Sequence, residues 1–180
     1  GLHNVGTYRI QIKARNKTGL WISRVQHMRF HIQKYEERGE PTPVAIVLGT
    51  DPSIGIASVA KIPKLQQEYA VAGGVRGEPL ELVACETSRL LVPAAAEIVI
   101  EGEIPPGYRE LEGPFGEYTG YMGPAGDSYV INVTCITHRA KPIFHAFISQ
   151  MPPSESSTIR GFGREMAIFK HLREELGLPV

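Results

Sequence analysis

Apolar and polar residues alternate along the first stretch of the chain with the two-residue period of a β-strand. Apolar side chains occupy every second position from Tyr8 to Ile12, which predicts a half-buried strand over residues 5–14. Residues 15–19 are polar and end in glycine, as turns often do, and residues 20–25 then have the pattern of a returning strand. The chain is therefore expected to open with an antiparallel hairpin.

After this hairpin, the apolar residues have the spacing of a helix. Met28, Ile32 and Tyr35 recur three to four residues apart, and a glycine and a proline follow, so we expect one helix here. Asp51 can cap a second, short helix that has Pro52 at its first position and ends near residue 60. Two more helices are expected, one through Leu65, Tyr69 and Ala72 up to Gly73-Gly74, and one over residues 164–176.

Strand-like runs dominate the rest of the chain. They cover residues 44–48, 80–85, 98–104, 129–137 and 143–149. Residues 105–126 are rich in glycine and proline and are expected to form a loop. About six strands, several of them hairpin-linked neighbours, together with a few helices predict an α+β fold built on a mainly antiparallel sheet or barrel.

The composition excludes several classes of protein. Nineteen lysines and arginines balance nineteen aspartates and glutamates, so no basic excess exists for binding nucleic acid or an anionic membrane. No apolar run approaches the ~20 residues of a membrane span. Two cysteines are too few for a disulfide scaffold and indicate a reducing compartment, so we expect a cytoplasmic, globular protein.

The length of 180 residues fits one domain with extensions better than two complete domains. The chain begins without methionine directly before a strand pattern, and it ends just after a helical one. These features favour a piece of a longer protein or a processed subunit.

The most unusual segment is the loop from Glu112 to Glu117, in which two carboxylates bracket the sequence Gly-Pro-Phe-Gly. Such a turn can bring the backbone close to a ligand, and its proline and phenylalanine can exclude water. Exclusion of water raises the pKa of a carboxyl toward the range that suits proton donation. The alternative is a solvated loop in which the two acids have no chemical role.

Glu81 and two histidines are candidate ion-binding residues. Glu81 interrupts an apolar strand, so it either faces solvent at a sheet edge or is compensated by a cation or metal. His27 and His31 would share one face of a helix, which is a zinc-binding spacing. Met28, however, stands where zinc proteases carry a glutamate, which favours a pair of histidines on the helix surface.

Taken together, these segments resemble the UbiD family of prenylated-flavin-dependent (de)carboxylases. Six segments carry the resemblance, in the order of the family and across about residues 3–150. They are Asn4-Val5-Gly6-Thr7-Tyr8-Arg9, Gln26-His27, residues 77–83, residues 97–104, residues 112–121 and residues 133–139. The loop from Glu112 to Glu117 is the most specific of them.

The resemblance implies that residues 1–150 form the central domain of the family, a split β-barrel that binds prenylated FMN. Residues 151–180 would be a connecting segment and helix that lead toward a C-terminal domain. Family members close the active site by movement between domains. The expected partners are therefore the other family domains or further copies of this chain.

The resemblance also implies a site for metal and cofactor. Asn4, His27 and Glu81 match positions that hold a divalent metal, usually manganese(II), against the cofactor phosphate, and these ligand types suit that ion. Backbone carbonyls of residues 57–59 would bind a potassium ion. The residues implied to bind the cofactor are Asn4, Val5, Gly6, Thr7, Tyr8, Arg9, Gln26, His27 and Glu81.

The implied reaction is the reversible, non-oxidative decarboxylation of an aromatic or α,β-unsaturated carboxylic acid. Arg9, which its strand position alone would make a surface charge, matches the catalytic arginine, and Glu112 and Glu117 match the catalytic acids. Arg9 would orient Glu112, and Glu117 would carry the proton to the substrate carbon.

Three other functions stay open at this point. The chain could bind a flavin and have no chemistry of its own until partner domains are present. It could be a zinc hydrolase that uses His27 and His31. It could also be a structural subunit that only scaffolds an oligomer.

Overall fold

The computed structural model describes residues 3–23, 25–60, 62 and 66–180. The chain divides into two compact units. The first unit combines residues 1–115 with 123–145, and the second combines residues 116–122 with 146–180. The candidate functional residues other than Glu117 belong to the first unit.

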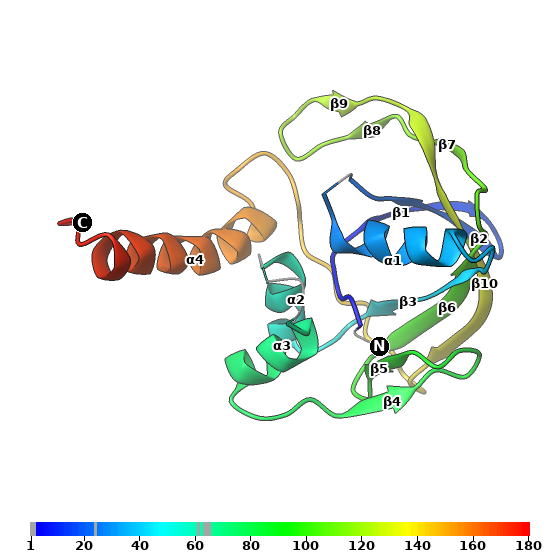
Figure 1. Ribbon diagram of the computed structural model, residues 1–180, viewed down its shortest axis with the longest axis horizontal. Helices are drawn as coiled ribbons and strands as arrows, with labels where there is room; N and C mark the ends of the chain where they lie inside the picture. Colours follow the sequence, from blue (N-terminus) through cyan, green and yellow to red (C-terminus); the bar gives the residue numbers. More distant parts are fainter. Residues whose placement is uncertain (1–2, 24, 61, 63–65) are drawn as a thin grey trace. The chain divides into compact units, whose positions relative to one another are not determined.

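An antiparallel sheet of six strands forms the centre of the first unit (Figure 1). The strands are β1 (Arg9–Ala14), β2 (Lys17–Trp21), β3 (Thr42–Leu48), β6 (Ile98–Ile104), β7 (Glu110–Glu112) and β10 (Gly126–His138). The main path runs β1-β2-β10-β6-β3, and β7 pairs with the first residues of β10. The expected α+β class with antiparallel strands is confirmed.

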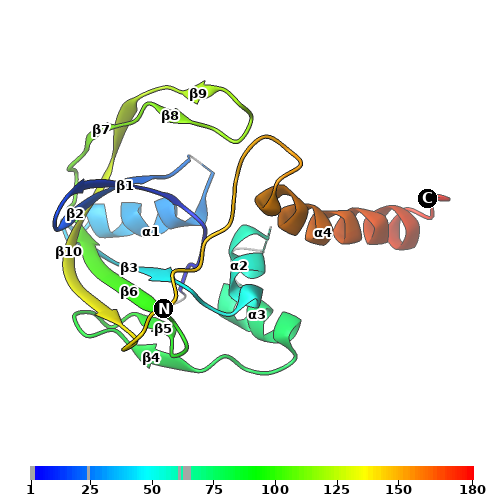
Figure 2. The same cartoon turned by 180° about the vertical axis from the view of Figure 1, so that it is seen from behind.

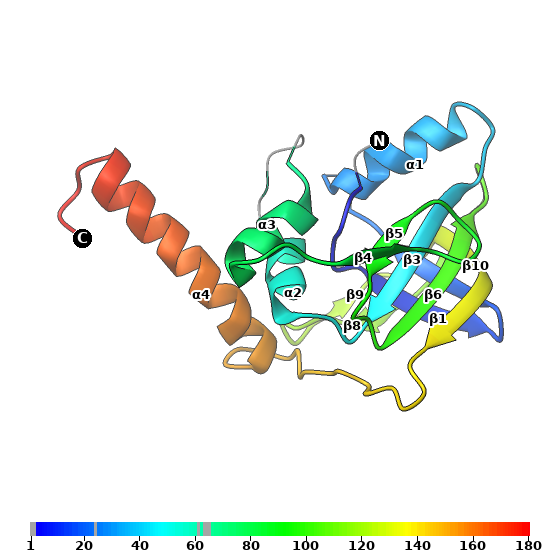
Figure 3. The same cartoon turned by 90° about the horizontal axis from the view of Figure 1, so that it is seen from below.

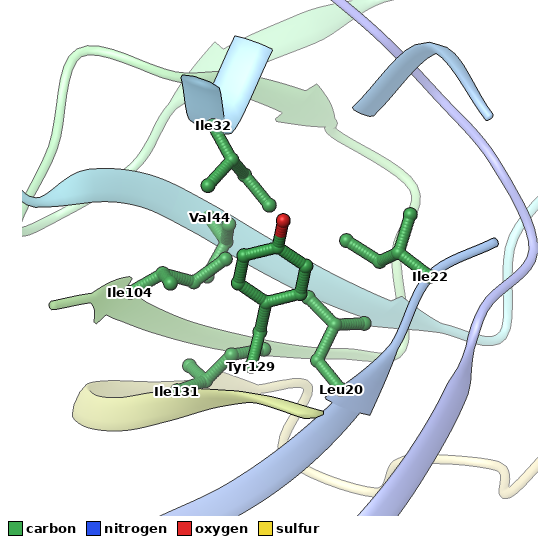
Figure 4. Close-up of a cluster of buried hydrophobic side chains, with 7 residues drawn as sticks. All are labelled: Leu20, Ile22, Ile32, Val44, Ile104, Tyr129 and Ile131. Atoms are coloured by element: carbon green, nitrogen blue, oxygen red, sulfur yellow. The ribbon is translucent and has the colours of Figure 1, made fainter. Parts of the chain in front are cut away.

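The sheet curves around helix α1 (His27–Glu36), as Figures 1 and 2 show from opposite sides. Ile32 of α1 is fully buried against apolar side chains of the sheet (Figure 4). The cluster consists of Leu20, Ile22, Ile32, Val44, Ile104, Tyr129 and Ile131. Each such side chain contributes roughly 1.5–3 kcal/mol by leaving water. The cluster therefore holds α1, and with it His27, against the sheet.

Two short helices, α2 (Pro52–Val59) and α3 (Glu68–Arg76), lie side by side in Figure 3. Ile54 and Ala57 of α2 pack against Ala72 of α3 in a second apolar cluster. The expected cap of α2 is confirmed, because the Asp51 carboxylate accepts a hydrogen bond from the Ser53 N–H at 2.9 Å.

The expected end of α3 at Gly73-Gly74 is wrong. The helix continues to Arg76 and ends at Gly77, which has a φ of 86°. Glycine inside a helix costs only about 1 kcal/mol, whereas a left-handed residue interrupts the helical backbone. Leu65, which was expected in this helix, lies outside the described residues.

The remaining elements are two small hairpins and the C-terminal helix. The hairpins are β4 (Leu82–Ala84) with β5 (Leu91–Pro93), and β8 (Phe115–Gly116) with β9 (Met122–Gly123). In the second unit, α4 (Glu155–Lys170) continues into a short π-helix, His171–Glu175. Among the helices of the described residues, none has the length and apolar character needed to cross a membrane.

Several expected segments differ from the structure, among them the returning strand of the first hairpin, which begins at Lys17, three residues earlier than expected. The first strand begins at Arg9, and Ile12, which was expected on its buried face, is 84% exposed. Residues 143–149 form no strand, and the expected loop of residues 105–126 contains β7, β8 and β9. The C-terminal helix begins at Glu155, earlier than expected.

Candidate functional site

Arg9 and the buried Glu112 form a partly buried, bidentate ion pair in the first unit. Arg9 Nε donates to Glu112 Oε1 at 2.9 Å, and Arg9 Nη2 donates to Oε2 at 2.7 Å. The Glu112 side chain is 1% exposed and that of Arg9 is 25% exposed. Two parallel charge-assisted hydrogen bonds fix the plane of the carboxylate as well as its position. The expected pairing of these residues is therefore present.

Neighbouring strands and two aromatic rings position this pair. Arg9 opens β1 opposite Trp21 of β2, and Glu112 closes β7 opposite Gly126 of β10. The guanidinium carbon of Arg9 lies 5.0 Å from the centroid of the Trp21 ring and 4.9 Å from that of Phe115. Aromatic faces attract a cation, so both rings stabilise Arg9 in the orientation that reaches Glu112.

Gly19 makes room for the buried acid. A Cβ atom at this position in β2 would lie 3.5 Å from Glu112 Cγ and 3.0 Å from Lys13 Cε. The space above Gly19 is thus already filled by these two side chains. Because protein interiors are close-packed, a larger residue would displace them.

Glu117 lies in the second unit, on the exposed turn between β8 and β9. Its N–H donates to the Tyr121 carbonyl at 2.8 Å, and its carbonyl accepts from the Gly120 N–H at 2.9 Å. These bonds order the backbone of the turn, on which Glu117 is an exposed residue. The expected action of Glu117 together with Arg9 and Glu112 stays a prediction.

Two hydrogen bonds hold the segment before β1. Asn4 Nδ2 donates to the Tyr8 hydroxyl at 3.0 Å, and the Val5 N–H donates to Glu68 Oε2 at 3.3 Å. Glu68 is the first residue of α3 and is only 7% exposed. Within the part of the chain that the structure describes, no lysine or arginine forms an ion pair with Glu68. A carboxylate oxygen is a ligand type that divalent cations take, so Glu68 is a candidate cation ligand.

Glu81 is exposed and precedes β4, which begins at Leu82. Of the two alternatives for this residue, the structure bears out the one in which Glu81 faces solvent, beside the small β4–β5 hairpin. Its role as a metal ligand stays a prediction. The buried acid is Glu68, which the sequence does not reveal. Acidic residues are common in the first turn of a helix, because the helix dipole stabilises a negative charge there. Nothing in the sequence pattern therefore marked Glu68 as buried.

His27 begins α1, and His31 follows one turn later. Burial lowers the pKa of His31 and nearby Lys34 lowers it further, whereas Glu68 acts in the opposite direction. The histidine face of α1 and Glu68 are therefore within electrostatic range. Among residues 3–23, 25–60, 62 and 66–180, no three His, Cys, Asp or Glu side chains gather as a metal-binding group. A metal site among these described residues would therefore need a ligand of another kind, such as an asparagine, and the zinc hydrolase stays an untested alternative.

Other expected cofactor-binding residues lie nearby in the first unit. The hydroxyls of Thr7 and Ser58 are 2.7 Å apart, which brings the expected potassium region at residues 57–59 to the segment before β1. Gln26 precedes α1, and its Oε1 accepts a hydrogen bond from the Ser23 N–H at 2.7 Å. The structure thus brings the segment of residues 4–9 together with the start of α1, through Tyr8 and Met28, and with the end of α2.

Comparison with known proteins agrees with this arrangement. Residues 1–152 match the family described as "UbiD: 3-octaprenyl-4-hydroxybenzoate carboxy-lyase Rift-related domain". The phenolic acid decarboxylase of Bacillus subtilis (strain 168) is 37% identical over 174 residues, and that of Escherichia coli O157:H7 is 34% identical over 175 residues. Each match covers 97% of this chain and 37% of the relative. The chain thus spans just over a third of the length of these relatives.

Solved structures are similar over the same range. The UbiD-class enzyme HmfF from Pelotomaculum thermopropionicum, in complex with FMN, is 39% identical with a TM-score of 0.87, covering 97% of this chain and 38% of that one. An evolved dimeric form of HmfF in complex with prFMN is also 39% identical, with a TM-score of 0.88, covering 97% and 40%. The vanillic acid decarboxylase of Sedimentibacter hydroxybenzoicus in its closed form is 33% identical with a TM-score of 0.82, covering 86% and 33%.

Proposed function

Because this chain belongs to the UbiD family, we propose that it is the prenylated-FMN-binding part of a carboxy-lyase. The enzyme would reversibly decarboxylate an aromatic or α,β-unsaturated carboxylic acid without oxidation. Relatives named phenolic acid decarboxylase and the HmfF complexes with FMN and prFMN support this proposal. A phenolic acid is therefore the first substrate to test.

The observation that carries the proposal is the partly buried pair of Arg9 and Glu112. Removing two charges from water costs free energy, and their mutual attraction offsets this cost only in part. Stabilisation of the fold is therefore a weak explanation for a pair of this kind. In an acid–base site, such a pair supplies a carboxylate of fixed orientation. We propose that Arg9 orients the Glu112 carboxylate. The Glu112 carboxylate would in turn stabilise positive charge and protons in the site.

Glu117 is the proposed group that carries a proton to and from the substrate carbon. Its exposure on the β8–β9 turn leaves it accessible to a small acid from solvent. It follows Glu112 by five residues across the Gly-Pro-Phe-Gly sequence, the segment that is most specific in the resemblance to the family. Proton transfer by a positioned carboxyl typically contributes 10²–10⁴-fold in rate.

The proposed metal site consists of Asn4, His27 and Glu68, with Glu68 in the role expected of Glu81. These residues fit manganese(II), because a buried carboxylate, an amide oxygen and an imidazole suit that cation beside a phosphate. Residues 4–9 and Gln26 would bind and orient the flavin, and carbonyls of residues 57–59 would hold potassium. Prenylated FMN, when bound, supplies the electron sink for decarboxylation.

The proposed domain division follows the family. Residues 1–150 would form the split β-barrel, to which the curved antiparallel sheet around α1 lends support. Residues 151–180 would connect it to a further domain. Exposed apolar side chains on α4, including Ile159, Ile168 and Phe169, support association with that domain or with another copy.

The test is to load the chain with prenylated FMN and Mn²⁺ and to follow hydrogen–deuterium exchange and carbon dioxide release from a phenolic acid. Glu117→Gln should abolish both while the flavin absorbance of the bound cofactor is retained. Glu103→Gln, at an exposed position of β6, is the matched control and should change neither. Undiminished exchange in Glu117→Gln would remove Glu117 from the mechanism.

A second candidate is a flavin-binding domain that acts only with partner domains. The observation in its favour is that the chain covers 37% of its decarboxylase relatives. It predicts bound flavin with no turnover by the chain alone. Turnover by the chain alone would exclude this candidate.

A further inference from the structure

The Tyr8 hydroxyl contacts Asn4, a proposed metal ligand, and the backbone of the residue that follows His27, another proposed ligand. Its hydroxyl accepts a hydrogen bond from Asn4 Nδ2 at 3.0 Å. Burial raises the pKa of Tyr8, and hydrogen bonds with Asn4 and with the backbone of Met28 act against that rise. Met28 directly follows His27 in α1. One hydroxyl therefore contacts Asn4 and the first turn of the helix that carries His27.

The ring of Tyr8 is held in place on two sides. It packs, together with Met28, against the buried cluster beneath α1. A Cβ atom at Gly6 would lie only 2.7 Å from the Tyr8 ring, so the ring lies directly against the backbone of Gly6. The hydroxyl is thus presented from a rigid position, as a residue that orients a ligand requires.

The chemistry of an amide makes this orientation matter. An asparagine side chain has a carbonyl oxygen that binds cations and an NH₂ group that only donates hydrogen bonds. Because Nδ2 of Asn4 is engaged by Tyr8, Oδ1 is the end of the amide available to a cation. A half-turn of the amide would direct the NH₂ group at the metal instead.

We propose that Tyr8 is a positioning residue of the metal site, whose hydroxyl holds the Asn4 amide with its carbonyl oxygen toward the cation. The inference rests on the proposed function, because it requires a divalent cation at Asn4. It adds a residue that does not itself touch the metal. Outer partners of this kind typically contribute about 10- to 100-fold to metal affinity.

The experiment titrates Mn²⁺ alone into the 180-residue chain and measures free Mn²⁺ by electron paramagnetic resonance. Tyr8→Phe should weaken Mn²⁺ binding by about tenfold or more. Tyr35→Phe is the matched control, because Tyr35 lies at the other end of α1 against Arg38, and it should leave the affinity unchanged. Phenylalanine keeps the ring in the core, and urea unfolding checks that the variant is folded.

The Asn4→Asp background tests whether the Tyr8 hydroxyl orients the side chain of residue 4. A carboxylate has two equivalent oxygens, so it presents an oxygen to the cation whichever way it is turned. Adding Tyr8→Phe to Asn4→Asp should therefore weaken Mn²⁺ binding far less than it does beside asparagine. A merely structural role for Tyr8 would give the same loss in both backgrounds.

Three results would overturn the inference. Equal Mn²⁺ affinities of the wild type and Tyr8→Phe, with binding lost in Asn4→Ala, would reject it and leave the metal site standing. Equal losses in the asparagine and aspartate backgrounds would also reject the orienting role. No Mn²⁺ binding by the wild type would reject the proposed metal site and this inference together.

Discussion

Removing the arginine from the Arg9–Glu112 pair should destabilise the first unit more than changing the acid. Arg9→Met leaves Glu112, which is 1% exposed, as a buried charge without a partner. Breaking a buried pair in this way costs about 3–5 kcal/mol in the free energy of unfolding. Glu112→Gln keeps one oxygen that can accept from Arg9 and loses one charge-assisted hydrogen bond, worth about 1.5–3 kcal/mol.

The double variant Arg9→Met/Glu112→Leu sharpens this prediction. It removes both charges, so the penalty of the unpaired carboxylate disappears and much of the stability lost in Arg9→Met should return. Lys17→Met is the control, because it breaks the more exposed pair of Lys17 with Glu110, and such pairs are worth about 0–1 kcal/mol.

The assay is urea unfolding at neutral pH followed by tryptophan fluorescence. Trp21 is the sole tryptophan of the sequence and stacks on Arg9, so it reports directly on the first unit. A loss in Arg9→Met no larger than that in Lys17→Met would refute the reasoning. A double variant less stable than Arg9→Met would refute it as well.

Two further predictions concern Glu101 and Gly19. Burial raises the pKa of Glu101, but hydrogen bonds from the Thr87 hydroxyl and from the backbone N–H groups of Glu86 and Thr87 outweigh this and hold its pKa below its ordinary value. Since the folded state has the lower pKa, this stabilisation is full above about pH 4.5 and is lost as the pH falls through the folded pKa. Urea titrations should thus find Glu101→Gln less sensitive to acid than the wild type, and equal sensitivity would contradict the assignment. Gly19→Ala should cost about 1–3 kcal/mol by crowding Lys13 and Glu112, whereas Gly74→Ala, which meets no atom within 4 Å in α3, should be neutral or stabilising, and similar effects of the two would count against a filled space above Gly19.

Local patterns predicted most of the secondary structure because local forces decide it. The alternation in β1, the helical spacing of α1 and the Asp51 cap of α2 each depend on neighbours within a few positions. Residues 143–149 were expected to be a strand from their apolar composition alone. The Ile143 N–H instead bonds to the Glu97 side chain, and a strand needs a partner strand that composition cannot supply.

The candidate site depended on the resemblance and on the structure in different ways. Arg9 and Glu112 are 103 positions apart, so no periodicity could have paired them, and only the family likeness did. The family likeness placed the metal-binding acid at Glu81, whose apolar neighbours left both a solvent-facing and an ion-compensated position open. Burial depends on the packing of the whole unit, and that packing encloses Glu68 and leaves Glu81 exposed.

The most direct test of the proposed site is anomalous diffraction at the manganese edge from crystals of this chain grown with MnCl₂ and FMN. We expect one anomalous peak within coordination distance of Asn4 Oδ1, the His27 ring and the Glu68 carboxylate, next to the density of the FMN phosphate. A peak at Glu81, or flavin density with no manganese beside Asn4, would contradict the proposed site.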